Sequence, residues 1–143
     1  MPSIVSWPAE FPQGQVRRQL ATGCDWLPTI AAACGAEVGS QKLDGRDLRQ
    51  VISNADAASP HHSFYWRLGR GPKAQWVVRE GDWKLLGNPR DTRKKATLNA
   101  DDRLFLVNLA EDLSETKNLA KAQPNVVARL LVLQRKYEQG LNR

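Results

Sequence analysis

Three short runs of strand-forming residues, joined by very short turns, constrain this chain most. They are residues 64–68, 74–79 and 83–87, and the turns between them contain Gly69, Gly71 and Pro72, then Gly81. Turns of this length join neighbouring strands that run in opposite directions. The pattern therefore predicts an antiparallel meander in the middle of the chain.

Two further segments complete this part of the fold. Residues 103–109 predict a fourth strand, after a polar stretch from 88 to 102 that we interpret as a solvated loop. Residues 125–139 follow a proline and carry an apolar stripe at helical spacing. We expect a four-stranded antiparallel sheet with a C-terminal helix packed on it.

The first third of the chain has a different pattern. Residues 22–34 predict a helix that stops at Gly35, and residues 47–53 a second, shorter helix. Residues 3–7 predict a strand cut off by Pro8, and no partner strand follows before residue 64. Helices and strands segregate along the chain, so the fold class is α+β. The unpartnered strand suggests a fold that begins upstream.

Composition and charge exclude several classes of protein. The chain has 143 residues and a net charge of +6, which fits a globular protein that attracts anions but selects no particular partner. No apolar run is long enough to span a membrane, and the start lacks the basic residues of a signal peptide. We therefore expect no membrane partner.

The residues that usually bind metals are few. His61 and His62 are adjacent, so on a strand they point to opposite faces, and Cys24 and Cys34 have neither redox nor zinc-site spacing. We predict both cysteines to be buried small apolar residues, and we expect no metal ligands in this chain.

Other sites are weakly supported. The Gly69–Gly71 turn precedes a strand and includes a proline without an N–H group, so it does not fit a phosphate-binding loop. Basic residues alternate with tryptophans over residues 67–84, but core packing and a solvent face explain that pattern better than nucleic-acid binding. The adjacent acids at 101–102 and 111–112 fit turns better than an acid–base pair.

Several strings, taken in order, resemble the C-terminal part of the sulfatase family, in particular its arylsulfatase and N-acetylgalactosamine-sulfatase-like branch. The string from Pro2 to Pro8 resembles V-P-x-I-V-x-W-P-G, that from Asp25 to Ile30 resembles D-x-L-P-T-[IL], and that from Leu43 to Leu48 resembles D-G-x-[SD]-L. Further on, residues 78–85 resemble R-x-G-D-W-K-L, and residues 104–119 resemble L-Y-D-L-x-x-D-P-x-E-x-x-N-L-A. The departures are mild: Leu113, Asn108 and Ala9 replace Pro, Asp and Gly.

The resemblance implies a division of the chain. Residues 1–58 would be the end of the catalytic domain, packed against an alkaline-phosphatase-like α/β domain that is absent here, and residues 59–143 the C-terminal subdomain. Family members form a formylglycine nucleophile in a C-x-[PA]-x-R motif and bind calcium, but neither cysteine here stands in that motif. We therefore expect no catalytic residue and no cofactor in this chain, with calcium and formylglycine in the absent N-terminal domain only.

The resemblance also implies a substrate-facing region. The string from Pro60 to Arg67 resembles the family's entry into the small sheet, where a histidine can line the pocket for an anionic sugar. An ordinary surface loop explains the string equally well. Cations and imidazoles recognise sulfate through charge-assisted hydrogen bonds, and tryptophans stack on sugars. The candidate substrate-binding residues are His61, His62, Arg67, Trp76 and Arg90. The predicted core residues are Trp26, Leu27, Ile30, Trp83, Leu85, Leu104, Leu106, Leu130 and Leu133.

The leading hypothesis is the C-terminal part of a sulfuric ester hydrolase, inactive alone, which completes the fold and the rim of the substrate pocket. Its expected partners are the N-terminal catalytic domain and, through the whole enzyme, a sulfated small molecule or glycan, but no nucleic acid. The alternatives are a stand-alone module that binds an anionic glycan or a partner protein, and a remnant without function. The family is commonly exported, but this chain has no signal peptide, so its compartment stays open.

Overall fold

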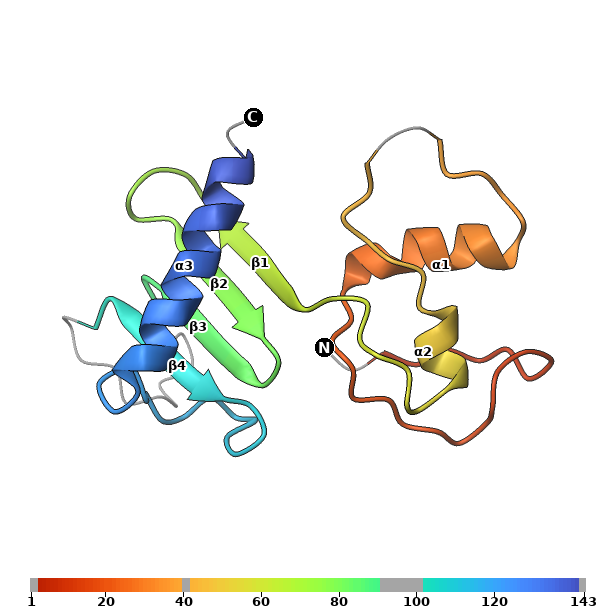
Figure 1. Ribbon diagram of the computed structural model, residues 1–143, viewed down its shortest axis with the longest axis horizontal. Coiled ribbons are helices and arrows are strands. Elements are labelled where there is room, and N and C mark those ends of the chain that lie inside the picture. The colour runs from red at the N-terminus through yellow and green to blue at the C-terminus, as the bar shows by residue number, and fades with distance from the viewer. Residues whose placement is uncertain (1–2, 40–41, 91–101, 142–143) are drawn as a thin grey trace. The chain divides into compact units, whose positions relative to one another are not determined.

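The computed structural model describes residues 3–39, 42–90 and 102–141, in two compact units. Unit 1 comprises residues 1–62 and unit 2 residues 63–143, and each is described by itself (Figure 1). The boundary lies between His62 and Ser63. That these units correspond to the two parts of a sulfatase stays a prediction. Most of the predicted polar loop, residues 91–101, lies outside the described residues.

Unit 2 contains the predicted meander. Its strands are β1 (Ser63–Leu68), β2 (Gln75–Glu80), β3 (Trp83–Gly87) and β4 (Leu104–Asn108), in the spatial order β1-β2-β3-β4. Every neighbouring pair is antiparallel. The α+β prediction of a four-stranded antiparallel sheet is confirmed.

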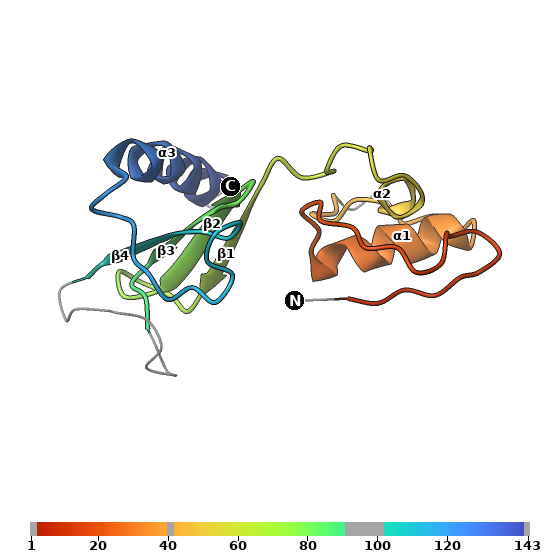
Figure 2. The same ribbon diagram turned by 90° about the horizontal axis from the view of Figure 1, so that it is seen from below.

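Helix α3 (Pro124–Leu141) packs on one face of this sheet (Figure 2). Its Leu130 is fully buried against Val78, Leu85 and Leu106, one residue from each of three strands. These residues alternate with others that point to the opposite face, as the pleat of a strand requires. The alternation confirms the predicted helix and three of the predicted core leucines.

The outer edge of β4 is closed by the segment that follows it. The Asn118 side chain accepts a hydrogen bond from the Leu106 N–H (3.0 Å) and donates one to the Leu104 carbonyl (3.0 Å), and the Leu119 N–H donates to the Leu106 carbonyl (2.8 Å). An Asn amide can do this because it offers a donor and an acceptor side by side. The Asn-Leu pair therefore terminates the sheet.

Unit 1 consists of short elements joined by long connections. A 3₁₀ turn (Gly23–Asp25) leads into α1 (Trp26–Ala33), and α2 (Arg49–Ser53) follows. Both predicted helices are therefore present, although each begins later than expected. The predicted strand at 3–7 is not formed: a strand requires a hydrogen-bonded neighbour, and within the described residues this segment has none.

The burial predicted for α1 and its flanks was wrong in part. Leu27 and Ile30 are 57% and 58% exposed, and Cys24 and Cys34 are exposed too. The helical spacing correctly predicts an apolar side of α1, but the described residues place nothing over it. Among the described residues, no helix has both the length and the apolar composition needed to cross a membrane.

Candidate functional site

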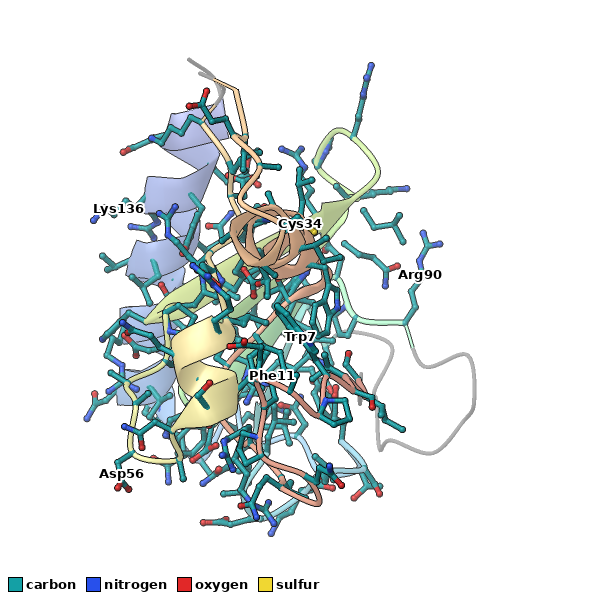
Figure 3. All side chains as sticks on the ribbon, turned by 90° about the vertical axis from the view of Figure 1, so that its right-hand side faces the viewer. Trp7, Phe11, Cys34, Asp56, Arg90 and Lys136 are labelled. Atoms are coloured by element: carbon teal, nitrogen blue, oxygen red, sulfur yellow. The ribbon has the colours of Figure 1, made fainter. Side chains whose placement is uncertain are left out.

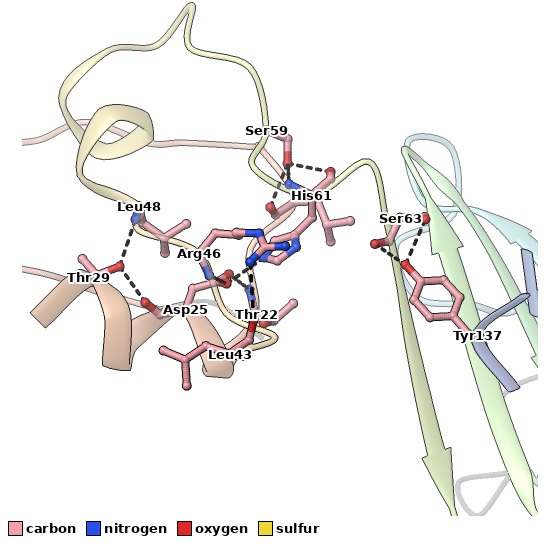
Figure 4. Close-up of polar contacts among 11 residues, drawn as sticks. Thr22, Asp25, Thr29, Leu43, Arg46, Leu48, Ser59, His61, Ser63 and Tyr137 are labelled. Carbon is pink, nitrogen blue, oxygen red and sulfur yellow. Dashed lines mark hydrogen bonds and ion pairs between the residues drawn. The ribbon is translucent and has the colours of Figure 1, made fainter. Parts of the chain in front are cut away.

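Unit 1 contains a fully buried carboxylate, that of Asp25. It accepts hydrogen bonds from the Thr22 N–H (2.7 Å), the Arg46 N–H (2.8 Å) and Nε2 of His61 (2.6 Å) (Figure 4). A buried carboxylate is costly unless its lone pairs are used. These three donors come from separate parts of the chain, so Asp25 connects them.

Two of the sequence strings meet at this carboxylate. Gly45 lies against the turn that carries Asp25: a Cβ at Gly45 would lie 2.0 Å from the Cys24 carbonyl oxygen. The Thr29 hydroxyl donates to the Asp25 carbonyl (2.6 Å) and accepts from the Leu48 N–H (2.9 Å). The D-x-L-P-T and D-G-x-[SD]-L strings are thus hydrogen-bonded to each other. Only glycine fits at position 45, where their backbones come closest.

The structure places the two candidate histidines differently. His61 is buried with its Nε2 on Asp25, and the Ser59 hydroxyl lies within donating distance of the carbonyls of Leu20 (2.9 Å) and His61 (3.0 Å), to one of which it donates at a time. His62 is exposed. Within unit 1, His61 therefore helps to hold the segment before β1, whereas His62 faces outward.

Arg67 and Trp76 are brought together as direct partners across β1 and β2, on the sheet face that carries α3. Arg67 forms an ion pair with Glu138 of α3 (2.8 Å). The Trp76 ring covers Gly87, where a Cβ would lie 2.0 Å from it. Both side chains are thus engaged inside unit 2.

Tyr65 belongs to the same contact between β1 and α3. Its hydroxyl donates to Glu138, and its ring stacks on Tyr137 with centroids 5.6 Å apart. Burial, together with the hydrogen bond to the Glu138 carboxylate, raises the pKa of Tyr65 to about 12. Glu138 therefore links Tyr65 and Arg67 of β1 to α3.

Arg90 is exposed and extends away from the sheet (Figure 3). It follows β3 in sequence, so it does not join Arg67 and Trp76 on the strands themselves. The role of the five candidates in substrate binding stays a prediction. Sequence reasoning missed Asp25, although its place at the head of the D-x-L-P-T string was visible.

Metal-binding residues do not gather in the part of the chain that the structure describes. No group of three His, Cys, Asp or Glu side chains lies close enough there to hold a metal ion. The expectation that calcium and formylglycine belong to the N-terminal domain stays a prediction.

These motifs and this fold define a class of protein: the chain is related to the sulfatase family and corresponds to its C-terminal part. It is 30% identical to arylsulfatase A of Bos taurus over 91% of its own length, and 31% identical to arylsulfatase A of Homo sapiens over 93%. The chain spans only 28% and 29% of the lengths of these two relatives. No protein-family model matches it.

A solved structure shares the fold. The crystal structure of Ps i-CgsB superimposes with a TM-score of 0.71 and 24% identity, over 92% of this chain and 27% of that one. At this level of identity the likeness shows the fold alone. The resemblance to sulfatases inferred from the sequence strings is therefore confirmed, with arylsulfatases among the similar proteins.

Proposed function

We propose that this chain is the C-terminal part of a sulfuric ester hydrolase, where it completes the fold and the rim of the substrate pocket. One observation carries the proposal: the match covers more than nine-tenths of this chain but less than a third of each arylsulfatase. The rest of the relatives' length would supply the catalytic domain.

Sulfate-ester hydrolysis requires a nucleophile, a positive clamp for developing charge, and an acid for the leaving oxygen. Neither Cys24 nor Cys34 stands in the motif that yields formylglycine. On this proposal the nucleophile and the calcium belong to the catalytic domain, and this chain alone does not turn over substrate.

The exposed apolar side chains of unit 1 support docking on that domain. Leu27 and Ile30 are one turn apart on α1, and Ile4 and Val16 are also exposed in the connections. Apolar surface of this kind is stabilised when it is covered. We propose that the catalytic domain covers it.

Unit 2 would contribute its exposed candidate to the pocket rim. Arg90 is exposed, whereas Arg67 is paired with Glu138. In unit 1, His61 is held by Asp25 and His62 is exposed. Imidazole and guanidinium groups bind sulfate through charge-assisted hydrogen bonds. We propose a sulfated small molecule or glycan as substrate, with Arg90 as its first contact in unit 2 and a smaller share for Arg67 and Trp76, and we keep His62 as a separate candidate in unit 1.

A chimera tests this function. The chain replaces the corresponding segment of bovine arylsulfatase A, and hydrolysis of an aryl sulfate is measured for the chimera and for the chain alone. We expect turnover by the chimera only, and loss of turnover in the double variant Leu27→Glu, Ile30→Glu. Val132→Glu is the matched control, because Val132 is 63% exposed on α3 in unit 2.

Two results would refute the proposal: turnover by the chain alone, or a folded chimera without turnover. Equal loss of turnover in the Val132→Glu control would refute the docking surface on α1.

A further inference from the structure

The sheet of unit 2 has a second face, on the side away from α3, which we call the outer face. Tyr65 and Arg67 point to α3, so Phe64, Trp66 and Leu68 point to the outer face, because successive side chains of a strand alternate. Their direct partners on β2 are Arg79, Val77 and Gln75. The proposed function uses none of these residues.

The described residues cover the outer face unevenly. At the β4 end, Phe105 and Val107 are buried, and Glu115 reaches Lys84 of β3 with both carboxylate oxygens (2.6 and 2.8 Å). At the β1 end, Trp66 is 41% exposed and Leu68 73%. Among the described residues, the segment after β4 therefore shields the β4 end, and we call the more exposed β1 end the open end.

An aromatic pair stands at the open end. The ring centroids of Trp66 and Phe64 are 4.7 Å apart, with the planes tilted by 42°. Contact with Phe64 restricts the Trp66 ring, so a ligand that stacks on it immobilises little additional side chain. A flat, partly exposed indole of this kind suits the apolar face of a sugar ring.

A cation adjoins this pair. Arg79 lies directly across from Phe64, and its Nε donates to the Gly81 carbonyl (2.9 Å), which holds the guanidinium toward the turn between β2 and β3. The neighbouring Lys84 already has Glu115 as its partner. A guanidinium has five donors in a fork that matches the oxygens of an anion, so Arg79 suits a sulfate group.

We propose that Trp66, Phe64 and Arg79 form a binding site for sulfated sugar on the outer face of unit 2. The indole would stack on a sugar ring while Arg79 binds a sulfate group of the same oligosaccharide. The inference rests on the proposed function, which makes sulfated glycans the substrate class.

Binding to the full chain tests the site, with a heparin-derived hexasaccharide and its desulfated counterpart as probes at low salt. We expect binding of the sulfated probe only. Trp66→Ala should weaken binding about fivefold through lost stacking, and Trp66→Phe by less. Arg79→Gln should weaken it at least as much and reduce its salt dependence.

Trp7→Ala is the matched control. Trp7 is 37% exposed and also contacts an aromatic neighbour, Phe11 at 5.5 Å, but it lies in unit 1 (Figure 3). It should bind the sulfated probe like the unchanged chain. Near-ultraviolet circular dichroism of each variant verifies that the fold is retained.

The proposal fails if the sulfated probe does not bind, if it binds no better than the desulfated one, or if the Trp66 and Arg79 variants of retained fold bind normally. Equal weakening by Trp7→Ala would also refute it. The arylsulfatase chimera separates this failure from failure of the proposed function, because a small aryl sulfate has no sugar ring for the Trp66 indole to stack on. Turnover by the chimera without glycan binding by the chain refutes only the sugar site on the outer face.

Discussion

The two units are stabilised by different means. In unit 2 the core cluster is apolar and comes from three strands and α3: Val78, Leu85, Leu106 and Leu130. Unit 1 buries a carboxylate, Asp25, together with a few apolar residues such as Leu48, while the large apolar residues Leu27 and Ile30 are exposed. Exposed apolar surface of this kind is stabilised when it is covered, which the proposed function assigns to the catalytic domain.

The comparison also explains the sulfatase strings. Two of the strings in unit 1 contain residues that are hydrogen-bonded at or next to Asp25, and the Asn-Leu part of the last string in unit 2 closes the β4 edge. In these strings the side chains of Asp25, Thr29 and Asn118 accept hydrogen bonds from backbone N–H groups. Folding therefore explains these three strings.

The difference between the units should appear first in denaturation. We expect the full chain to unfold in two transitions, with unit 1 first, because unit 2 holds the apolar core. Residues 63–143 alone should retain the second transition. Circular dichroism in a urea titration measures both. A single transition shared by the two units would remove the basis of the comparison.

Asp25→Ala should have the largest effect of any single substitution in unit 1. It leaves the His61 ring and two backbone N–H groups without their acceptor in a buried place, at a cost of about 3–5 kcal/mol. The first transition should disappear while the second is unchanged. Asp56→Ala, at an exposed position, is the control, and an equal effect there would refute the role of Asp25.

Gly45→Ala should come next. The new Cβ would meet the backbone carbonyl of Cys24, which cannot rotate away, so we expect a loss of about 1–3 kcal/mol in the first transition. Gly23→Ala is the matched control, since a Cβ there has nothing within 4 Å. Equal midpoints for the two variants would contradict the close approach.

Gly87→Ala tests unit 2 in the same way. Here the new Cβ would meet the Trp76 ring, which is a side chain and can shift. The loss in free energy of unfolding should therefore be smaller than at Gly45, about 1 kcal/mol, and confined to the second transition. Tryptophan fluorescence should change with it. Gly140→Ala in α3 should be neutral or stabilising, because alanine favours a helix and has open space there.

Tyr65 gives the smallest effect, at alkaline pH. Because the pKa of Tyr65 is raised to about 12, the folded state favours the protonated phenol. The contribution of this phenol to the stability of unit 2 is therefore complete below pH ~10 and is lost as the pH rises toward 12. Glu138→Gln should lower the pKa of Tyr65 toward its ordinary value. Ultraviolet absorbance of tyrosinate follows the titration, and an unchanged curve in that variant would exclude Glu138 as a cause.

Local patterns predicted unit 2 well because each of its elements is specified by neighbours in sequence. Short turns imply the strand order, and alternation implies which residues meet α3. Unit 1 was predicted less well because its contacts join residues 21 to 36 positions apart, such as Asp25 with Arg46 and His61, which no periodicity reveals. The same limit applies to the candidate site, where spacing alone could not show that His61 is buried and His62 is not.

The Asn118 side chain has a consequence for solubility. A strand edge with free backbone groups is a template for pairing with other molecules, and this amide occupies the edge of β4. The sheet therefore has one blocked side and one, at β1, with no neighbouring strand among the described residues. Any edge-to-edge self-association of unit 2 would therefore occur between two β1 strands and stop at dimers. The blocked edge of β4 offers no second surface from which a fibre could grow.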